Sequence, residues 1–299
     1  NSARFSKNYE FHTIRKDNII EVLKNEIEPL RDLTKSINRL MLMPDAYIRQ
    51  KIRRHFIELD KKLFADDYRK FYIKGESKPP EIGAPFFWKR VLSKKGVILV
   101  HGYMAAPEEI KPLAEYLYKN GYSVYGARLR GHGTAPEDLA SRNWEKWYDS
   151  TGRAYIIMKN YLKSFAIAGF STGGDIALLQ AANKPGKFKA VISINAPLGL
   201  QDISSRFASA IVAWNKFLTK VRVQRGKLEF VENDPENPHI NYTRNPVYGV
   251  YQLRQLMDIV EKRLKNISDP ALIIQGTDDP VVNPASGMEI YRKIGARRK

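Results

Sequence analysis

The chain has 299 residues, 43% of them hydrophobic and 11% aromatic, which is typical of a globular protein with one large core and an appendage, or two small domains. The absence of cysteine excludes a disulfide scaffold, a thiol nucleophile and cysteine metal ligands, and it suits a reducing, cytoplasmic compartment. No apolar run approaches the roughly 20 residues of a membrane span, and the first residues lack a signal-peptide core.

The formal charge of +18 raises the question of a nucleic-acid partner. Residues 1–95 contain 22 Lys and Arg against 13 Asp and Glu, so the first third is the more basic part per residue. No zinc-finger spacing, RNP-like sequence or helix-turn-helix pattern accompanies these charges. We therefore expect solvated basic faces and no nucleic-acid partner.

Two amphipathic helices are predicted in residues 17–40 and 48–64, from apolar positions spaced by three and four. Pro29 bends or divides the first helix, and the second has a basic face. Such a helix can lie on an anionic membrane, or it can pack on a core with its charges in water. A polar, proline-containing break at residues 74–81 predicts a boundary between an N-terminal basic helical extension, 1–80, and a domain covering 81–299.

Beyond this break, residues 86–92 and 97–100 are predicted strands, and the second leads directly into the sequence His-Gly-Tyr-Met at 101–104. A helix follows over residues 107–120 and ends at a glycine. The next strand, 123–127, precedes a Gly-His-Gly loop at 131–133, and a further helix covers 144–161.

The chain is organised around residues 165–182, with the sequence FAIAGFSTGGDIALLQAA. An apolar strand runs into Gly169-Phe170-Ser171-Thr172-Gly173, and good helix formers follow. A strand–turn–helix of this kind places Ser171 at a strained apex, where a Cβ at Gly169 or Gly173 would collide with the crossing backbone. A plain Gly-Ser loop would also match G-x-S-x-G, but the flanking strand and helix favour the sharp turn.

After one more strand, 190–195, the strand–helix alternation stops, and residues 198–266 are predicted as a mostly helical cap insert. Its apolar residues could bind an acyl chain or simply pack on the core: Phe207, Ile211, Trp214, Phe217 and Leu218. The strand 271–275 then leads into Gly-Thr-Asp-Asp-Pro-Val-Val-Asn-Pro at 276–284, and a last helix covers 284–294.

These motifs resemble the α/β-hydrolases, and the Gly-His-Gly loop with its Pro-Glu-Asp-Leu continuation is similar to the carboxylesterase and monoacylglycerol lipase branch (serine aminopeptidase S33-like). The resemblance implies an α/β fold, with a mostly parallel sheet covered by helices on both faces, a helical cap insert and here an N-terminal helical extension. It covers about residues 86–299.

The resemblance also implies the site residues. Ser171 would be the nucleophile, and the family pattern Gly-x-x-Asp-x-x-Val selects Asp279, not Asp278, as the acid. The backbone N–H groups of Tyr103 and Thr172 would form the oxyanion hole. His101 and His132 are expected to brace their loops.

The family also carries a histidine after one further strand. The histidines of this chain are all earlier than Asp279: His12, His55, His101, His132 and His239. We expect the catalytic histidine beyond Lys299, with His239 in the cap as a weaker candidate.

The resulting hypothesis is a serine hydrolase that cleaves carboxylic esters through an acyl-enzyme, acting on a small ester or acylglycerol without metal or cofactor. Peripheral contact of the basic extension with an anionic membrane would be compatible with this activity. Two alternatives share the same residues. An acyltransferase would differ in its products with competing alcohols, and a catalytically dead binding or membrane-docking module would lack the histidine.

Overall fold

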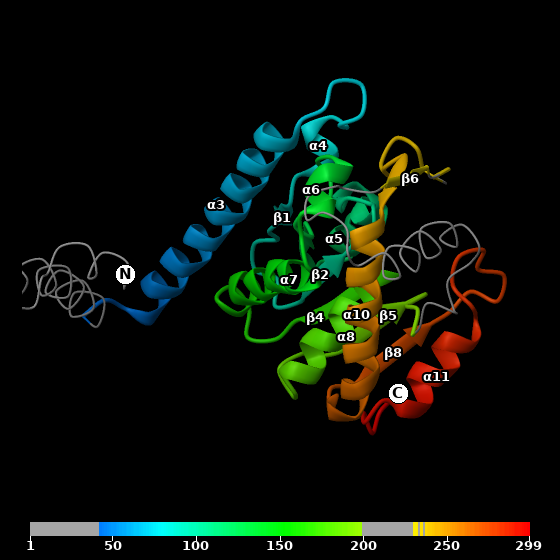
Figure 1. Cartoon of the computed structure of the whole chain (residues 1–299). Coiled ribbons are helices and arrows are strands. Elements are labelled where there is room, and N and C mark those ends of the chain that lie inside the picture. The colour runs from blue at the N-terminus through cyan, green and yellow to red at the C-terminus, as the bar shows by residue number, and fades with distance from the viewer. Residues whose placement is uncertain (1–41, 199–229, 233, 236) are drawn as a thin grey trace, which may run out of the picture. The chain divides into compact units, whose positions relative to one another are not determined.

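The computed structural model describes residues 42–198, 230–232, 234, 235 and 237–299 (Figure 1). Contacts divide the chain into two compact units, Asn1–Lys51 and Ile52–Lys299, so the second unit begins before the predicted break at residues 74–81. The predicted helix 17–40 and the apolar stripe 207–218 lie outside the described residues. In the part of the chain that is described, no helix is long and apolar enough to cross a membrane.

A six-stranded sheet forms the centre of the second unit, in the order β1-β3-β2-β4-β5-β8. Only β1 is antiparallel to its neighbour; the other pairs are parallel. The strands are β1 (Phe86–Trp88), β2 (Gly96–Val100), β3 (Ser123–Ala127), β4 (Ala166–Phe170), β5 (Val191–Ile194) and β8 (Ala271–Ile274). The mostly parallel α/β sheet predicted from the sequence is therefore confirmed.

Helices cover both faces of this sheet (Figure 1). The side chains of β2 alternate between the two faces, with Val97 and Leu99 packed toward one helix and Ile98 and Val100 toward the others. The first face is covered by α5 (Lys111–Lys119), which follows the short η1 (Pro107–Ile110). The second is covered by α7 (Trp144–Lys159), α8 (Thr172–Asn183) and α10 (Val247–Arg263).

The helix α3 (Asp45–Phe71) extends the predicted helix 48–64 at both ends. From Ile52 onward it belongs to the second unit, where Phe56 and Ile57 pack against the main core and Phe64 is buried. Its acidic residues Asp60 and Asp67 are also buried, and both bind partners on the sheet and its loops. Packing on the core, one of the two interpretations of this amphipathic stripe, therefore occurs along this part of the helix.

Several elements differ from the sequence prediction. The loop regions contain the short helices α4 (Pro80–Gly83), α6 (Pro136–Ala140) and η4 (Leu264–Asn266), and β6 (Phe230–Glu232) pairs with β7 (Arg244–Pro246) as a separate two-stranded sheet. Residues 247–264, predicted from the sequence as part of the cap, contain all of α10. In the structure, α10 packs on α8, and its apolar residues join the main core: Leu253, Leu256, Met257 and Val260.

The end of the chain lies against the sheet. Helix α11 (Ala285–Lys293) contacts β8 and buries Ile290 in the core. The backbone N–H of Ala271, the first residue of β8, donates to the carbonyl of Arg298 at 3.0 Å. The chain thus returns to the outer side of β8 after α11.

Candidate active site

Ser171 stands at the turn between β4 and α8, as the sequence predicted. Its backbone has φ 52° and ψ −124°, a combination that L-residues rarely adopt. The surrounding structure holds this conformation, because the N–H of Ser171 donates to the carbonyl of Ile194 at 2.8 Å and its own carbonyl accepts from Gly174 N–H at 2.7 Å. The strained turn leaves the serine side chain at the edge of the sheet, in a pocket.

The two glycines of the motif are required by close backbone packing. A Cβ on Gly169 would lie 1.9 Å from the carbonyl oxygen of Gly173 in α8, and a Cβ on Gly173 would lie 2.3 Å from the carbonyl oxygen of Val100 in β2. Both distances are far below van der Waals contact. The glycine spacing around Ser171 is therefore a consequence of a helix that starts directly against two strands.

Asp279 occupies the turn after β8 and also lines the pocket. Its Oδ1 accepts from the backbone N–H groups of Val281 and Val282, both at 2.8 Å, and its Oδ2 accepts from the side-chain amide of Asn195 at 2.5 Å. These three donors fix the orientation of the carboxylate. Asp278 also lines the pocket, but its side chain has no such set of donors among the described residues.

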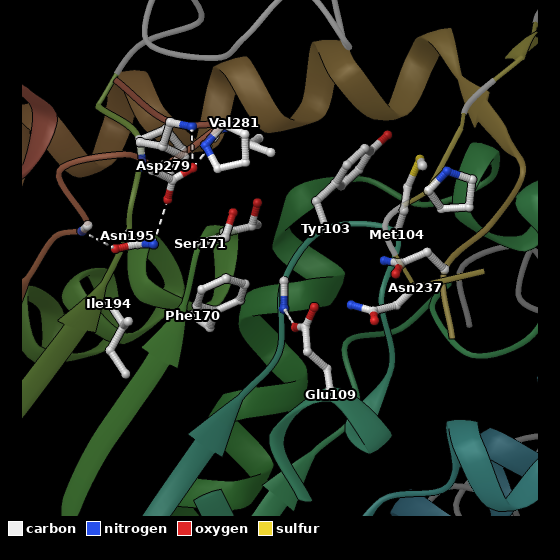
Figure 2. A pocket seen from close by; sticks show the side chains of 18 of the residues that line it. Tyr103, Met104, Glu109, Phe170, Ser171, Ile194, Asn195, Asn237, Asp279 and Val281 are labelled. Atoms are coloured by element: carbon white, nitrogen blue, oxygen red, sulfur yellow. Dashed lines mark hydrogen bonds between the residues drawn. The ribbon is translucent and has the colours of Figure 1, made fainter. Parts of the chain in front are cut away.

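Asn195 connects the two strand ends on which the site is built. It follows β5 with a positive φ of 49°, and while its amide donates to Asp279, its carbonyl oxygen accepts from the N–H of Gly276 at 2.9 Å (Figure 2). Asparagine is among the residues that tolerate this left-handed backbone. Sequence reasoning missed Asn195, although a polar residue at the carboxyl end of a buried parallel strand was a usable signal.

The predicted oxyanion residues flank the serine. Thr172 is the first residue of α8, where backbone N–H groups have no partner within the helix. On the other side, Gly102 is close enough that a Cβ on it would lie 3.5 Å from Ser171 Cβ, and Tyr103 follows it along the pocket wall. The Tyr103 side chain is buried and its hydroxyl donates to Asn245 at 3.1 Å. The loop after β2 thus runs beside Ser171.

His101 holds this loop to the neighbouring one. Its Nε2 accepts from Leu129 N–H at 3.1 Å, so its Nδ1 carries the proton and donates to the carbonyl of Gly102 at 2.9 Å. Burial lowers the pKa of His101 to about 4, which keeps the ring neutral. These two bonds support the bracing role expected from the sequence.

Glu109 is a second residue that the sequence analysis missed. Its side chain comes from η1 into the pocket, where Oε2 accepts from Gly102 N–H at 2.7 Å (Figure 2). Burial raises the pKa of Glu109 to about 7, against the opposing effect of the Gly102 hydrogen bond. The loop beside Ser171 is therefore attached to an acid that titrates near neutral pH.

The pocket that contains these groups has a volume of about 810 Å³. Apolar side chains form much of its lining: Met104, Ile110, Leu113, Phe170, Ile194, Leu253, Val281 and Val282. Its polar lining includes Ser171, Asp279 and Glu109, and also Asp234, Asn237 and Asn241. This size and lining suit a mostly apolar small molecule with one polar reacting group.

Histidines are not part of this pocket in the described residues. His101 and His132 are buried behind the loops, His55 lies on α3, and His239 is exposed in the segment before β7 and does not line the pocket. The structure therefore does not bring His239 to Ser171, while His12 lies outside the described residues. The predicted residues that it does bring together around one pocket are Tyr103, Ser171, Thr172 and Asp279.

Comparison with known proteins gives concordant matches. The family described as serine aminopeptidase, S33 matches residues 93–299. A thermostable monoacylglycerol lipase of Bacillus sp. (strain H-257) is 30% identical over 207 residues, covering 68% of this chain and 78% of that protein. A carboxylesterase of Bacillus subtilis (strain 168) is 24% identical, covering 70% and 81%. A solved structure from work on the metagenome-derived lipolytic enzymes LipS and LipT is 27% identical with a TM-score of 0.62, covering 72% and 84%.

Proposed function

The chain belongs to the serine aminopeptidase S33 family of α/β-hydrolases, and from this membership and its pocket we propose that it hydrolyses carboxylic esters with Ser171 as the nucleophile. The observation that carries the proposal is the strained turn at Ser171, which opens into the same pocket as the triply held carboxylate of Asp279. Ester cleavage is also the activity named for the two curated relatives.

In the proposed reaction, Ser171 Oγ attacks the ester carbonyl carbon while a base accepts the hydroxyl proton. The carbonyl oxygen becomes an oxyanion, and the N–H groups of Tyr103 and Thr172 donate to it. Collapse of this intermediate breaks the ester bond, and the base returns its proton to the departing alcohol. The same base then takes a proton from water, whose oxygen attacks the acyl carbon. Collapse of this second intermediate breaks the bond to Ser171 Oγ and releases the acid, and the base returns the proton to Oγ.

The base in this scheme is a histidine that Asp279 would orient, and none of the described residues that line the pocket supplies it. Asp279 suits the role because one oxygen is held by two backbone N–H groups, so the carboxylate keeps its orientation when the other oxygen changes partner. Asn195, which now donates to that second oxygen, would then also position the acid.

The substrate we propose is a small ester with an apolar acyl group, of the monoacylglycerol type that one relative's name states. The largely apolar lining and the volume of about 810 Å³ support this class. Phe170, 37% exposed beside Ser171, would contact the acyl part.

The test is hydrolysis of short-chain p-nitrophenyl esters by the full-length protein. Ser171→Ala should remove at least 99.9% of the activity, since loss of a triad member typically costs several powers of ten. Ser164→Ala, which changes an exposed serine outside the pocket, is the matched control and should leave the rate unchanged. More than a tenth of the activity remaining in Ser171→Ala would exclude Ser171 as the nucleophile.

Two further measurements separate the alternatives. Added alcohol or thiol acceptors should not outcompete water for the acyl group; predominant transfer to the acceptor would identify an acyltransferase. Free imidazole, acting as an external base, should raise the ester hydrolysis rate in the wild type and not in Ser171→Ala. Hydrolysis that stays absent both with and without imidazole would favour a catalytically dead module.

A further inference from the structure

The amino-terminal edge of the sheet carries a concentration of positive charge that the proposed reaction does not use. Because β2, β3, β4 and β5 are parallel, the four loops that enter them lie at the same edge, opposite the pocket. We call these loops the basic edge: residues 89–95, 116–122, 159–165 and 184–190. They contain ten Lys and Arg and no Asp or Glu.

These cations have no acidic partner in the part of the chain that the structure describes. None of the ten forms an ion pair with any residue that the structure describes: Lys89, Arg90, Lys94, Lys95, Lys119, Lys159, Lys163, Lys184, Lys187 and Lys189. Most of them are exposed. Several lie over tyrosine rings, as Arg90 does over Tyr118 and Lys95 over Tyr122. Such uncompensated charge is costly unless an anionic partner approaches it.

The loop 89–95 adds an apolar tip to this charged edge. Val91 is 74% exposed and Leu92 95% exposed, and Leu92 has a positive φ of 67°, which is rare for a bulky residue. The loop is held in place behind the tip, because Ser93 Oγ donates to the carbonyl of Gly121 at 2.6 Å and Arg90 N–H donates to Ser123 Oγ at 3.0 Å. The two apolar side chains thus project from a fixed loop between two pairs of cations.

We propose that the basic edge docks on an anionic lipid bilayer, with Val91 and Leu92 inserting among the lipid headgroups. Lipid is favoured over nucleic acid because projecting aliphatic side chains gain from an apolar phase, and because the tyrosines that could stack on bases already face their own cations. Docking would leave the pocket facing away from the bilayer. The inference is independent of the proposed reaction.

The test uses the full chain and vesicles of phosphatidylcholine with or without 30% phosphatidylserine. Partitioning should be at least tenfold stronger on the anionic vesicles at 0.1 M NaCl and should fall at 0.5 M, where screening is stronger. Each Lys near an anionic surface raises the partition coefficient roughly fivefold. The double change Lys94→Glu, Lys95→Glu should therefore weaken partitioning more than tenfold. Val91→Asp with Leu92→Asp should do the same.

Matched controls come from another part of the unit. Tyr72→Asp with Lys74→Glu changes an exposed aromatic and an exposed lysine in the segment before α4, and should leave partitioning within twofold. Lys61→Glu with Lys62→Glu tests the exposed charges of α3. Because the chain has no cysteine, Leu92→Cys accepts a single environment-sensitive dye, whose emission should shift to the blue on anionic vesicles, while a dye on Tyr72→Cys should not shift.

Several results would overturn the proposal. One is equal partitioning on neutral and anionic vesicles, or none on either. Another is weaker partitioning on anionic vesicles in the Lys61→Glu, Lys62→Glu variant but not in the variants of the basic edge. A third is binding of a duplex or single-stranded oligonucleotide that depends on Lys94 and Lys95 while vesicles do not bind. Circular dichroism spectra of all variants, matching the wild type, ensure that a loss reflects the surface and not unfolding.

Discussion

Replacing Asp67 with asparagine tests how α3 is attached to the loops of the hydrolase unit. The buried carboxylate binds three arginines from the segment after β3 and after α6, at 2.9 Å from Arg128, 3.1 Å from Arg130 and 2.9 Å from Arg142. Asp67 and Arg128 are each only 4% exposed in their side chains, so water cannot replace the lost partner. Asp67→Asn keeps the shape and removes the charge.

The expected cost follows from the burial of each partner. Removing one member of a buried ion pair costs about 3–5 kcal/mol. Arg128 would keep Asp138 as a partner, and Arg130 is partly exposed, so the lower end, about 3 kcal/mol, is expected. For a unit of this size that corresponds to a fall in Tm of roughly 6–12 °C. Asp66→Asn is the matched control, because Asp66 is 46% exposed and forms an exposed ion pair with Arg69. This change should cost below about 0.5 kcal/mol.

The difference in free energy of unfolding between the wild type and Asp67→Asn should depend on pH in a defined direction. Burial tends to raise the pKa of Asp67, but hydrogen bonds and charges from the three arginines outweigh it, and the net pKa is lowered. The stabilisation is therefore present above the unfolded-state value of 3.8 and is lost as the pH falls through the lower folded-state value. Urea unfolding followed by circular dichroism measures this difference in free energy of unfolding at pH 7 and at pH 3. If Asp67→Asn and Asp66→Asn differ by less than 1 kcal/mol at pH 7, the buried network does not stabilise the unit.

Three other changes probe the pocket and its supports. Asp279→Asn should lower ester hydrolysis by orders of magnitude and Asp278→Asn by less than threefold, and the reverse ranking would assign the acid to Asp278. The folded-state pKa of Glu109 is raised to about 7, so the free energy of unfolding of the wild type should fall by at most about 3 kcal/mol between pH 5 and 7.5. Urea titrations should show a smaller fall in Glu109→Gln. An equal dependence of unfolding free energy on pH in both proteins would contradict this. Gly173→Ala should not yield soluble folded protein. Gly152→Ala, whose new Cβ would have its nearest contact at 3.9 Å, should gain up to about 1 kcal/mol in free energy of unfolding. Equal Tm values for the two variants would contradict the packing argument.

The sequence predicted the central strands and the turn at Ser171 because both depend on local patterns. Apolar runs of the right length mark β2, β3, β4, β5 and β8. The glycines flank Ser171 at a fixed spacing, which is visible in the sequence although Gly169 packs on the adjacent α8 and Gly173 packs on the distant β2. The short helices α4 and α6 and the three-residue strands β6 and β7 are too brief for any periodicity to appear.

Interactions between distant segments could not be predicted in the same way. Asp67 lies 61 residues before Arg128, and Asn195 lies 84 residues before Asp279, so no spacing rule connects either pair. In the sequence, Asp67 lies beyond the predicted helix 48–64 and has no feature that sets it apart from other charged residues. Only the parallel order of the strands brings the loop after β3 against α3, and the end of β5 against the turn after β8.

The same argument applies to the net charge of +18, which by itself does not distinguish structural from functional cations. At the carboxyl edge of the sheet, Arg128, Arg130 and Arg142 form ion pairs with Asp67 and Asp138. At the amino edge, the lysines and arginines of the four entering loops have no acidic partner among the described residues. Since parallel strands gather all entering loops at one edge, charges that are scattered along the sequence combine there into a single surface. The paired arginines stabilise the fold, and the unpaired cations remain available for an anionic partner.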